Sequence, residues 1–214
     1  MDRCPAHGSP SIAAHVAKGK TTTLMRCTFS SAWALLIAMA CTMPFAVTLD
    51  AQQSKAPTEY DVKSAYLYNF GKFVRWPENQ TAAGEPFSIC ILGLDPFGAA
   101  LDHTLAGQTI DGKSITAKRI SHPEEATDCR ILFIGLSEES RWKEILAALS
   151  KKSILTVSEI PQFSRRGGMI QFVMEGNRVR FEVNLTAAEN AGLTLSSELL
   201  KVATTVKRNP TPGA

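Results

Sequence analysis

The sequence lacks the residue patterns by which most enzymes are recognised. Beyond residue 51 it contains two histidines, His103 and His122, and neither belongs to a spaced metal-ligand motif such as H-x-x-x-H. The G-x-S-x-G turn of many hydrolases is missing. Gly167 and Gly168 follow two arginines, but a strand is expected after them, which favours a turn into a hairpin over a phosphate-binding loop. We therefore expect no catalytic residues, no metal ligands and no cofactor.

An excess of charge of one sign is also missing. The formal net charge is +3, and residues 1–51 contribute four basic and two acidic residues to it. Beyond residue 51 the chain holds 19 of the 23 basic residues and 18 of the 20 acidic ones. Nucleic-acid-binding domains carry a basic patch or stripe, so this nearly neutral part gives no reason to expect a nucleic-acid partner.

No hydrophobic run is long enough to cross a membrane comfortably. The apolar run at residues 32–40 follows a short basic region with Arg26, and Pro44 interrupts what comes after it. A membrane span needs roughly 20 apolar residues, whereas this layout is typical of a secretory signal peptide. We assign residues 1–51 to a signal peptide with an over-extended start, Met25 being the hypothetical initiator, and residues 52–57 to a leader. A retained membrane anchor is the alternative.

Cysteine is sparse, and its positions predict a disulfide. Three of the five cysteines precede residue 51 and would be lost with the signal peptide. The remaining two, Cys90 and Cys129, each lie in or begin a strand-like apolar run. In an oxidising compartment such a pair favours a structural disulfide, and two buried thiols that pack as small hydrophobic groups are the alternative.

Short apolar runs alternate with helical patterns from residue 58 onward. Thr58 is placed to cap a first helix, along which Val62, Tyr66, Phe70 and Phe73 recur at helical spacing and which Trp76–Pro77 would end. Strands are expected at 87–92, 115–120, 131–134 and 154–157, with a short helix around 101–105 and a helix capped by Ser137 that contains Trp142. This alternation predicts an α/β domain with helices on both faces of a mostly parallel sheet.

The last part of the chain departs from that alternation. Runs at 169–174 and 178–183 flank Glu175-Gly176-Asn177 and predict a β-hairpin at one edge of the sheet. A short helix at 187–193 follows, and then a last helix with Leu195, Leu199, Val202 and Val206 on one side. Residues 208–214 form a polar tail that we expect to be disordered. The sequence thus predicts a single α/β domain at 58–207, with a mixed, mostly parallel sheet, a C-terminal β-hairpin and further helices.

Several of these segments resemble the YfiR-like family of small periplasmic proteins. The matching motifs are VKSAYLYNFGKFVRWP at 62–77, CILG at 90–93, DPFG at 95–98 and CRILFI at 129–134. The longest match runs from GGMIQF at 167–172 through RFEVN at 180–184 to LLKVA at 199–203. The resemblance covers about residues 58–207, and its motifs are specific in combination.

The resemblance implies a periplasmic α/β domain, often dimeric, without catalytic activity. The founding member of the family represses an inner-membrane diguanylate cyclase by binding its periplasmic sensor region, and so controls cyclic di-GMP and biofilm formation. For this chain it implies a homodimer and an inner-membrane partner, either a diguanylate cyclase or a sensor kinase. Cys90 and Cys129 match a disulfide position of the family, whereas the founding member's second, closely spaced cysteine pair has no equivalent after Cys129.

We expect self-association or partner docking at exposed parts of the first and last helices. The residues concerned are Tyr66, Phe70, Phe73, Trp76, Leu199 and Val202. For the aromatic face of the first helix, burial in the core is the alternative. For the function, the alternative is a periplasmic small-ligand carrier or sensor that uses a cleft at the strand ends.

Overall fold

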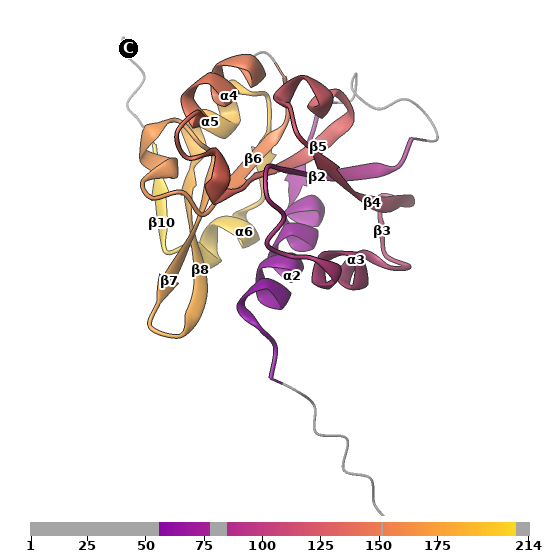
Figure 1. Cartoon of the computed structure of the whole chain (residues 1–214). Helices are drawn as coiled ribbons and strands as arrows, with labels where there is room; N and C mark the ends of the chain where they lie inside the picture. The colour runs from indigo at the N-terminus through magenta and orange to yellow at the C-terminus, as the bar shows by residue number, and fades with distance from the viewer. Residues whose placement is uncertain (1–55, 78–84, 151, 209–214) are drawn as a thin grey trace, which may run out of the picture. The chain divides into compact units, whose positions relative to one another are not determined.

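The computed structural model describes residues 56–77, 85–150 and 152–208 (Figure 1). The predicted signal peptide, most of the predicted leader and nearly all of the predicted tail lie outside these residues. The helices are α2 (Glu59–Phe73), α3 (Ala99–Leu105), α4 (Trp142–Leu149), α5 (Leu185–Asn190) and α6 (Ser197–Val202). Short 3-10 segments lie at η2 (Pro123–Asp128), η3 (Leu136–Glu138) and η4 (Phe163–Arg166).

A mixed eight-stranded sheet is the centre of the domain. Its strands are β2 (Phe87–Leu92), β3 (Thr109–Ile110), β4 (Lys113–Ile120), β5 (Cys129–Ile134), β6 (Leu155–Ser158), β7 (Ile170–Glu175), β8 (Arg178–Asn184) and β10 (Thr205–Lys207). Their order is β10-β8-β7-β6-β5-β2-β4-β3, and every pair is parallel except β7–β8 and β3–β4. The predicted mixed, mostly parallel sheet is confirmed.

The chain changes direction around β2. From β2 it passes through α3 to β4 on one side, and it then returns through η2 to β5 on the other side (Figure 1). The point between β2 and β5 is therefore the topological switch point of the sheet, where open α/β sheets commonly bind ligands at the carboxyl ends of their strands.

Helices cover both faces of the sheet, as the sequence predicts. Side chains alternate along β2, where all six residues are buried, so that Ile89 and Ile91 face one core while Cys90 and Leu92 face the other. The first core includes residues from α2, α3, α5 and α6. The second includes residues from α4, η2 and η4.

Helix α2 begins where the sequence predicts but ends earlier. Thr58 is its N-cap and forms a capping box with Asp61, which satisfies backbone donors of the first turn. The helix ends at Phe73 and not at Trp76–Pro77, because Val74 turns extended and pairs with Leu195. This pairing forms a separate two-stranded sheet of β1 (Val74–Arg75) and β9 (Thr194–Leu195).

Three local predictions are wrong. Ser137 lies within η3 and does not cap α4, which starts after Arg141 with no side-chain cap. The residues expected on one last helix are divided, because Leu195 belongs to β9 and Val206 to β10. The β7–β8 hairpin is confirmed, with its turn at Gly176, but β10 pairs with β8, so the hairpin does not form the edge of the sheet.

Candidate functional site

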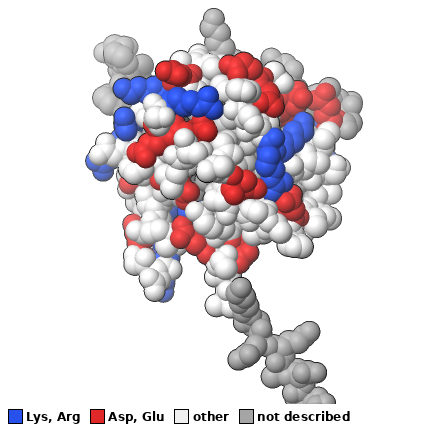
Figure 2. All heavy atoms as spheres, viewed as in Figure 1, with Lys and Arg blue, Asp and Glu red and all other residues white. Residues whose placement is uncertain are grey.

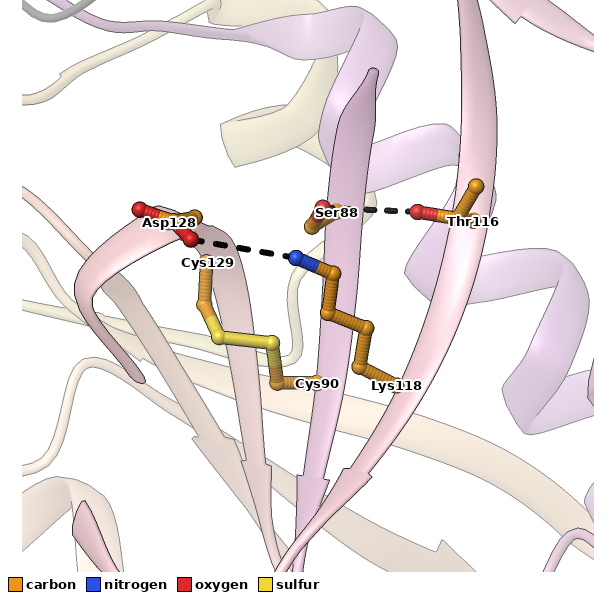
Figure 3. The surroundings of a disulfide bond; sticks show 6 residues. All are labelled: Ser88, Cys90, Thr116, Lys118, Asp128 and Cys129. Carbon is orange, nitrogen blue, oxygen red and sulfur yellow. Dashed lines mark hydrogen bonds and ion pairs between the residues drawn. A yellow bond between two sulfur atoms is a disulfide. The ribbon is translucent and has the colours of Figure 1, made fainter. Parts of the chain in front are cut away.

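Cys90 and Cys129 form a disulfide between the two strands at the switch point. Cys129 begins β5 opposite Ser88, and Cys90 lies two residues further along β2, with 5.8 Å between the two Cα atoms (Figure 3). Both side chains point into the second core and are almost completely buried. The predicted disulfide is therefore present, and the alternative of two free buried thiols does not hold.

Two polar contacts join β4 to the strands that the disulfide links. Lys118 of β4 reaches Asp128, the residue before Cys129, at 3.9 Å, and Ser88 hydrogen-bonds to Thr116 of β4 at 3.3 Å (Figure 3). Both partners of the Lys118–Asp128 pair are exposed, so water screens most of their attraction. These contacts tie β4 to the two strands that the disulfide joins.

The aromatic face of α2 lies mostly in the first core. Phe70 is fully buried and contacts the rings of Phe172 and Phe181, with centroids 5.9 and 5.1 Å away. Tyr66 is half-buried on the same two rings. This arrangement is typical of an interior aromatic cluster, in which rings meet at an angle or offset.

The residues expected to dock a partner divide into buried and exposed ones. Phe70 and Leu199 are buried in the core, so the expectation that they are exposed is wrong for this structure. Phe73 and Val202 are exposed, at 37% and 55% of their surface. Tyr66 and Trp76 are half-buried, and each packs against the first core. The role of the exposed residues in docking stays a prediction.

A buried cation that the sequence analysis missed joins α2 to the end of β6. The Lys63 side chain is 3% exposed and donates to the carboxylates of Glu59 and Glu159. Burial lowers the pKa of Lys63, but the hydrogen bonds to the two carboxylates outweigh it and hold that pKa above its usual value. Burial and the nearby Glu159 raise the pKa of Tyr60, whose hydroxyl lies 3.4 Å from the Glu159 carboxylate.

A second charged cluster fixes the loop after β2. Arg119 of β4 donates to Asp95 and to both carboxylate oxygens of Asp102, at 2.7–2.9 Å. The hydrogen bond from Arg119 lowers the pKa of Asp102, and the same bond raises the pKa of Arg119. Over the face that Figure 2 shows, acidic and basic side chains are intermixed. The arrangement is that of structural ion pairs.

The carboxyl ends of β2 and β5 are packed against each other. The Leu94 backbone donates to Ser137 Oγ at 3.0 Å, and Gly135 N donates to the Leu92 carbonyl at 3.0 Å. A Cβ at Gly93 would collide with Ser137, and one at Gly135 would lie 3.0 Å from the Leu94 carbonyl. These contacts hold the two loops close together at the carboxyl ends of β2 and β5.

A cleft of about 770 Å³ lies instead at the amino ends of the strands. We call it the basic cleft. Its lining comprises Lys72, Val74, Arg75, Trp76, Glu85, Pro86, Phe87, Ile110, Asp111, Lys113, Thr127, Asp128, Cys129, Arg130, Lys152 and Ile154. Cys129, which begins β5, is one of these residues. Sequence periodicity gives no sign of this cleft, since its residues come from five separate segments.

The described residues offer neither a metal site nor a membrane-spanning helix. Within 56–77, 85–150 and 152–208, no group of three or more histidine, cysteine or acidic residues is placed to hold a metal ion. Among the helices of the same ranges, none has the length and apolar character needed to cross a membrane.

Comparison with known families gives a match over most of the chain. The model of a family described as YfiR/HmsC-like matches residues 60–204. The match begins at the second residue of α2 and ends just before β10, so it includes both cysteines and most of the described domain.

Similarity to solved structures is weak. A conserved domain protein from Vibrio cholerae aligns with a TM-score of 0.46 and 13% sequence identity. The alignment covers 67% of this chain and 60% of the Vibrio cholerae chain. An ABC domain from Streptococcus pneumoniae in complex with L-Trp aligns with a TM-score of 0.42 and 12% sequence identity. The alignment covers 56% of this chain and 55% of the Streptococcus pneumoniae chain. This chain thus spans little more than half the length of either protein.

Proposed function

Since the chain belongs to the YfiR/HmsC-like family, we propose that it binds the periplasmic sensor region of an inner-membrane signalling protein and represses it. The family is periplasmic, regulatory and non-catalytic, and it suggests control of cyclic di-GMP signalling. The finer proposal is that the partner is a diguanylate cyclase, with a sensor kinase as the other possible type. The family match over residues 60–204 is the observation that carries this proposal.

The mechanism we propose is stoichiometric. A regulator that binds the inactive conformation of its partner more tightly than the active one shifts the partner toward the inactive state. The shift cannot exceed the difference in binding free energy between the two states. No chemical step by this chain is needed.

The exposed apolar residues at the ends of α2 and α6 are the proposed docking surface. We define it by Phe73 and Val202, which are exposed although both belong to helices packed on the first core. The Ser196 backbone N–H, at the N-cap of α6, donates to the Phe73 carbonyl at 2.9 Å and so holds the start of α6 against the end of α2, while Val202 is the last residue of α6. The same surface is the proposed site of homodimer formation.

The test combines membrane pull-down with a measurement of cellular cyclic di-GMP. Phe73→Glu and Val202→Glu are expected to reduce both recovery of a membrane protein with a cyclase or kinase domain and repression of cyclic di-GMP. Met174→Glu is the matched control, because Met174 is also exposed, at 48%, but lies on the β7–β8 hairpin. Full binding and full repression by folded Phe73→Glu and Val202→Glu variants would reject the docking surface. Failure of the wild type to recover such a protein would reject the proposed function.

The second candidate is a periplasmic small-ligand-binding protein. The volume of the basic cleft, about 770 Å³, is the observation that favours it, because ligand sites in proteins commonly measure about 300–1,000 Å³. A ligand-binding protein of this kind would bind its ligand whether or not a membrane partner exists.

A further inference from the structure

We propose that the basic cleft binds a small organic anion, whose carboxylate or phosphate group contacts lysine and arginine side chains and whose apolar part contacts Trp76 and Phe87. One part of this inference rests on the proposed regulatory function: the anion would be a signal that changes partner binding. The binding site itself depends on the cleft alone.

The position of the cleft makes it a preformed site. Its residues come from the end of α2 with β1, the start of β2, the turn between β3 and β4, the start of β5, and the start of β6. Strands β2, β5 and β6 are neighbours in the sheet, and the disulfide joins the first two of them. A site at the ends of paired and cross-linked strands loses little conformational freedom when a ligand binds.

The charge of the lining favours an anion. It contains five cationic and three acidic side chains: Lys72, Arg75, Lys113, Arg130 and Lys152 against Glu85, Asp111 and Asp128. One of the acids, Asp128, also pairs with Lys118, which is not part of the lining. The lining thus carries an excess of two positive charges, and such an excess in a concave surface attracts ligands of opposite charge.

Arg130 is one of the cations of the lining that a bound anion would contact. Its side chain is half-buried, and burial lowers the pKa of Arg130 while the charge of Glu85 raises it. A bound oxyanion would therefore compensate for part of the lost hydration of the guanidinium group. Arginine presents paired N–H donors that match carboxylate and phosphate oxygens, so both anion types fit.

The apolar part of the lining indicates an organic ligand. The Trp76 ring meets Phe87 edge-on, with centroids 5.2 Å apart, and Val74 and Ile154 also line the cleft. The indole Nε1 of Trp76 is buried and has no hydrogen-bond partner among the described residues. Because Trp76 itself lines the cleft, its indole N–H signal is the natural reporter of binding.

The test follows the tryptophan indole N–H signals of the purified, oxidised full chain by NMR. Citrate is the organic probe and inorganic phosphate the simple one, and the signals are assigned by single Trp→Phe substitutions. We expect citrate to shift the Trp76 signal in a saturable way, and phosphate to shift it at higher concentrations because it has no apolar part. Trp142 is the internal reference, because it lies on α4 against Arg166, with 4.4 Å between guanidinium carbon and ring centroid, away from the lining.

Charge variants connect the signal to the cleft. The double variant Arg75→Gln with Arg130→Gln is expected to weaken citrate binding about thirtyfold, because two charged contacts at about 1 kcal/mol each sum to about 2 kcal/mol, and about 1.4 kcal/mol is a factor of ten. Lys201→Gln is the matched control, because Lys201 is exposed on α6 and is not part of the lining. Equal weakening by Lys201→Gln would indicate non-specific charge attraction and overturn the proposal.

Two further outcomes would also overturn the anion site. One is a Trp76 signal that does not move with either probe up to about 10 mM, a concentration that detects millimolar dissociation constants. The other is an equal shift of Trp142. Membrane pull-down tests the regulatory function separately, so citrate binding without a membrane partner rejects that function and leaves the site intact. Partner binding without citrate binding rejects the anion site and leaves the regulatory function intact.

Discussion

Removal of the Cys90–Cys129 disulfide is expected to lower the free energy of unfolding by about 4 kcal/mol. The two cysteines are 39 residues apart in the chain. In the chain-entropy model a loop of about 40 residues loses roughly 13 cal/mol/K on closure, which is about 4 kcal/mol at 25 °C. With an m-value of about 2 kcal/mol/M, the midpoint of urea unfolding should fall by roughly 2 M.

The assay compares four samples by equilibrium urea unfolding followed by circular dichroism. The wild type and the variant with both Cys90→Ala and Cys129→Ala are each measured with and without a phosphine reductant. We expect the reductant to destabilise the wild type and to leave the double variant unchanged, because the variant has no bond between these positions to reduce. The variant should also be less stable than the reduced wild type, since both sulfur atoms are buried and their removal leaves a small cavity.

A wild type with the same unfolding midpoint in both conditions would refute the reasoning. It would mean either that the bond does not form in the purified protein or that the unfolded chain is already compact between the two positions. Mass spectrometry after alkylation separates these cases, because it counts the free thiols. If the thiols are free, the proposed structural role of the disulfide is wrong. If the bond is present, the loop-closure estimate of about 4 kcal/mol is wrong.

Three further predictions concern the packing and the charged clusters. Phe70→Ala should lower the free energy of unfolding by about 3–5 kcal/mol in urea unfolding, because the ring is fully buried. Lys63→Met should lower the free energy of unfolding by about 3 kcal/mol or more, because the nearly buried Glu159 carboxylate then has no cation beside it. Adding Glu159→Gln should restore part of this free energy, because it removes the buried charge. A double variant no more stable than Lys63→Met would contradict this account. Asp102→Asn should lower stability at neutral pH. Arg119 holds the pKa of Asp102 below its usual value. The difference in free energy of unfolding between the variant and the wild type should therefore disappear as the pH falls below about 4. Urea unfolding measured at a series of pH values checks this.

The sequence predicts those parts of the fold that depend on local patterns. The continuous apolar run from Phe87 to Leu92 predicts a strand covered on both faces, and the structure has that strand with the same bounds. The β7–β8 hairpin follows from two alternating runs around Gly176. Thr58 caps α2 as its neighbouring acidic residues indicate.

Non-local pairings were not predictable in the same way. Strands β1 and β9 are two residues long, and Val74 is extended and pairs with Leu195, which lies far along the chain. Val206 continues the apolar spacing of α6, but the chain becomes extended at Ala203, and Val206 pairs with Val183 of β8. Such short strands carry too few residues for a periodicity of their own.

The candidate site shows the same division. The cysteine pair was predictable from compartment and count, whereas the burial of Phe70 and Leu199 was not, because helical spacing cannot tell a core-facing stripe from a partner-facing one. The pair Lys63–Glu159 was missed because its members lie 96 residues apart. Only the i,i+4 spacing of Glu59 and Lys63 could have indicated a charged contact at this position.

The disulfide also determines how the protein responds to mechanical tension. A pull applied at the two ends of the domain can straighten the chain before Cys90 and after Cys129, but the intervening segment, with α3, β3, β4 and η2, stays in a closed loop. At roughly 3.5 Å per extended residue, this withholds about 130 Å of contour length. Strand β4, with its partner β3 and helix α3, is therefore shielded from the applied force. This segment would bear no load until the sulfur bridge is cut.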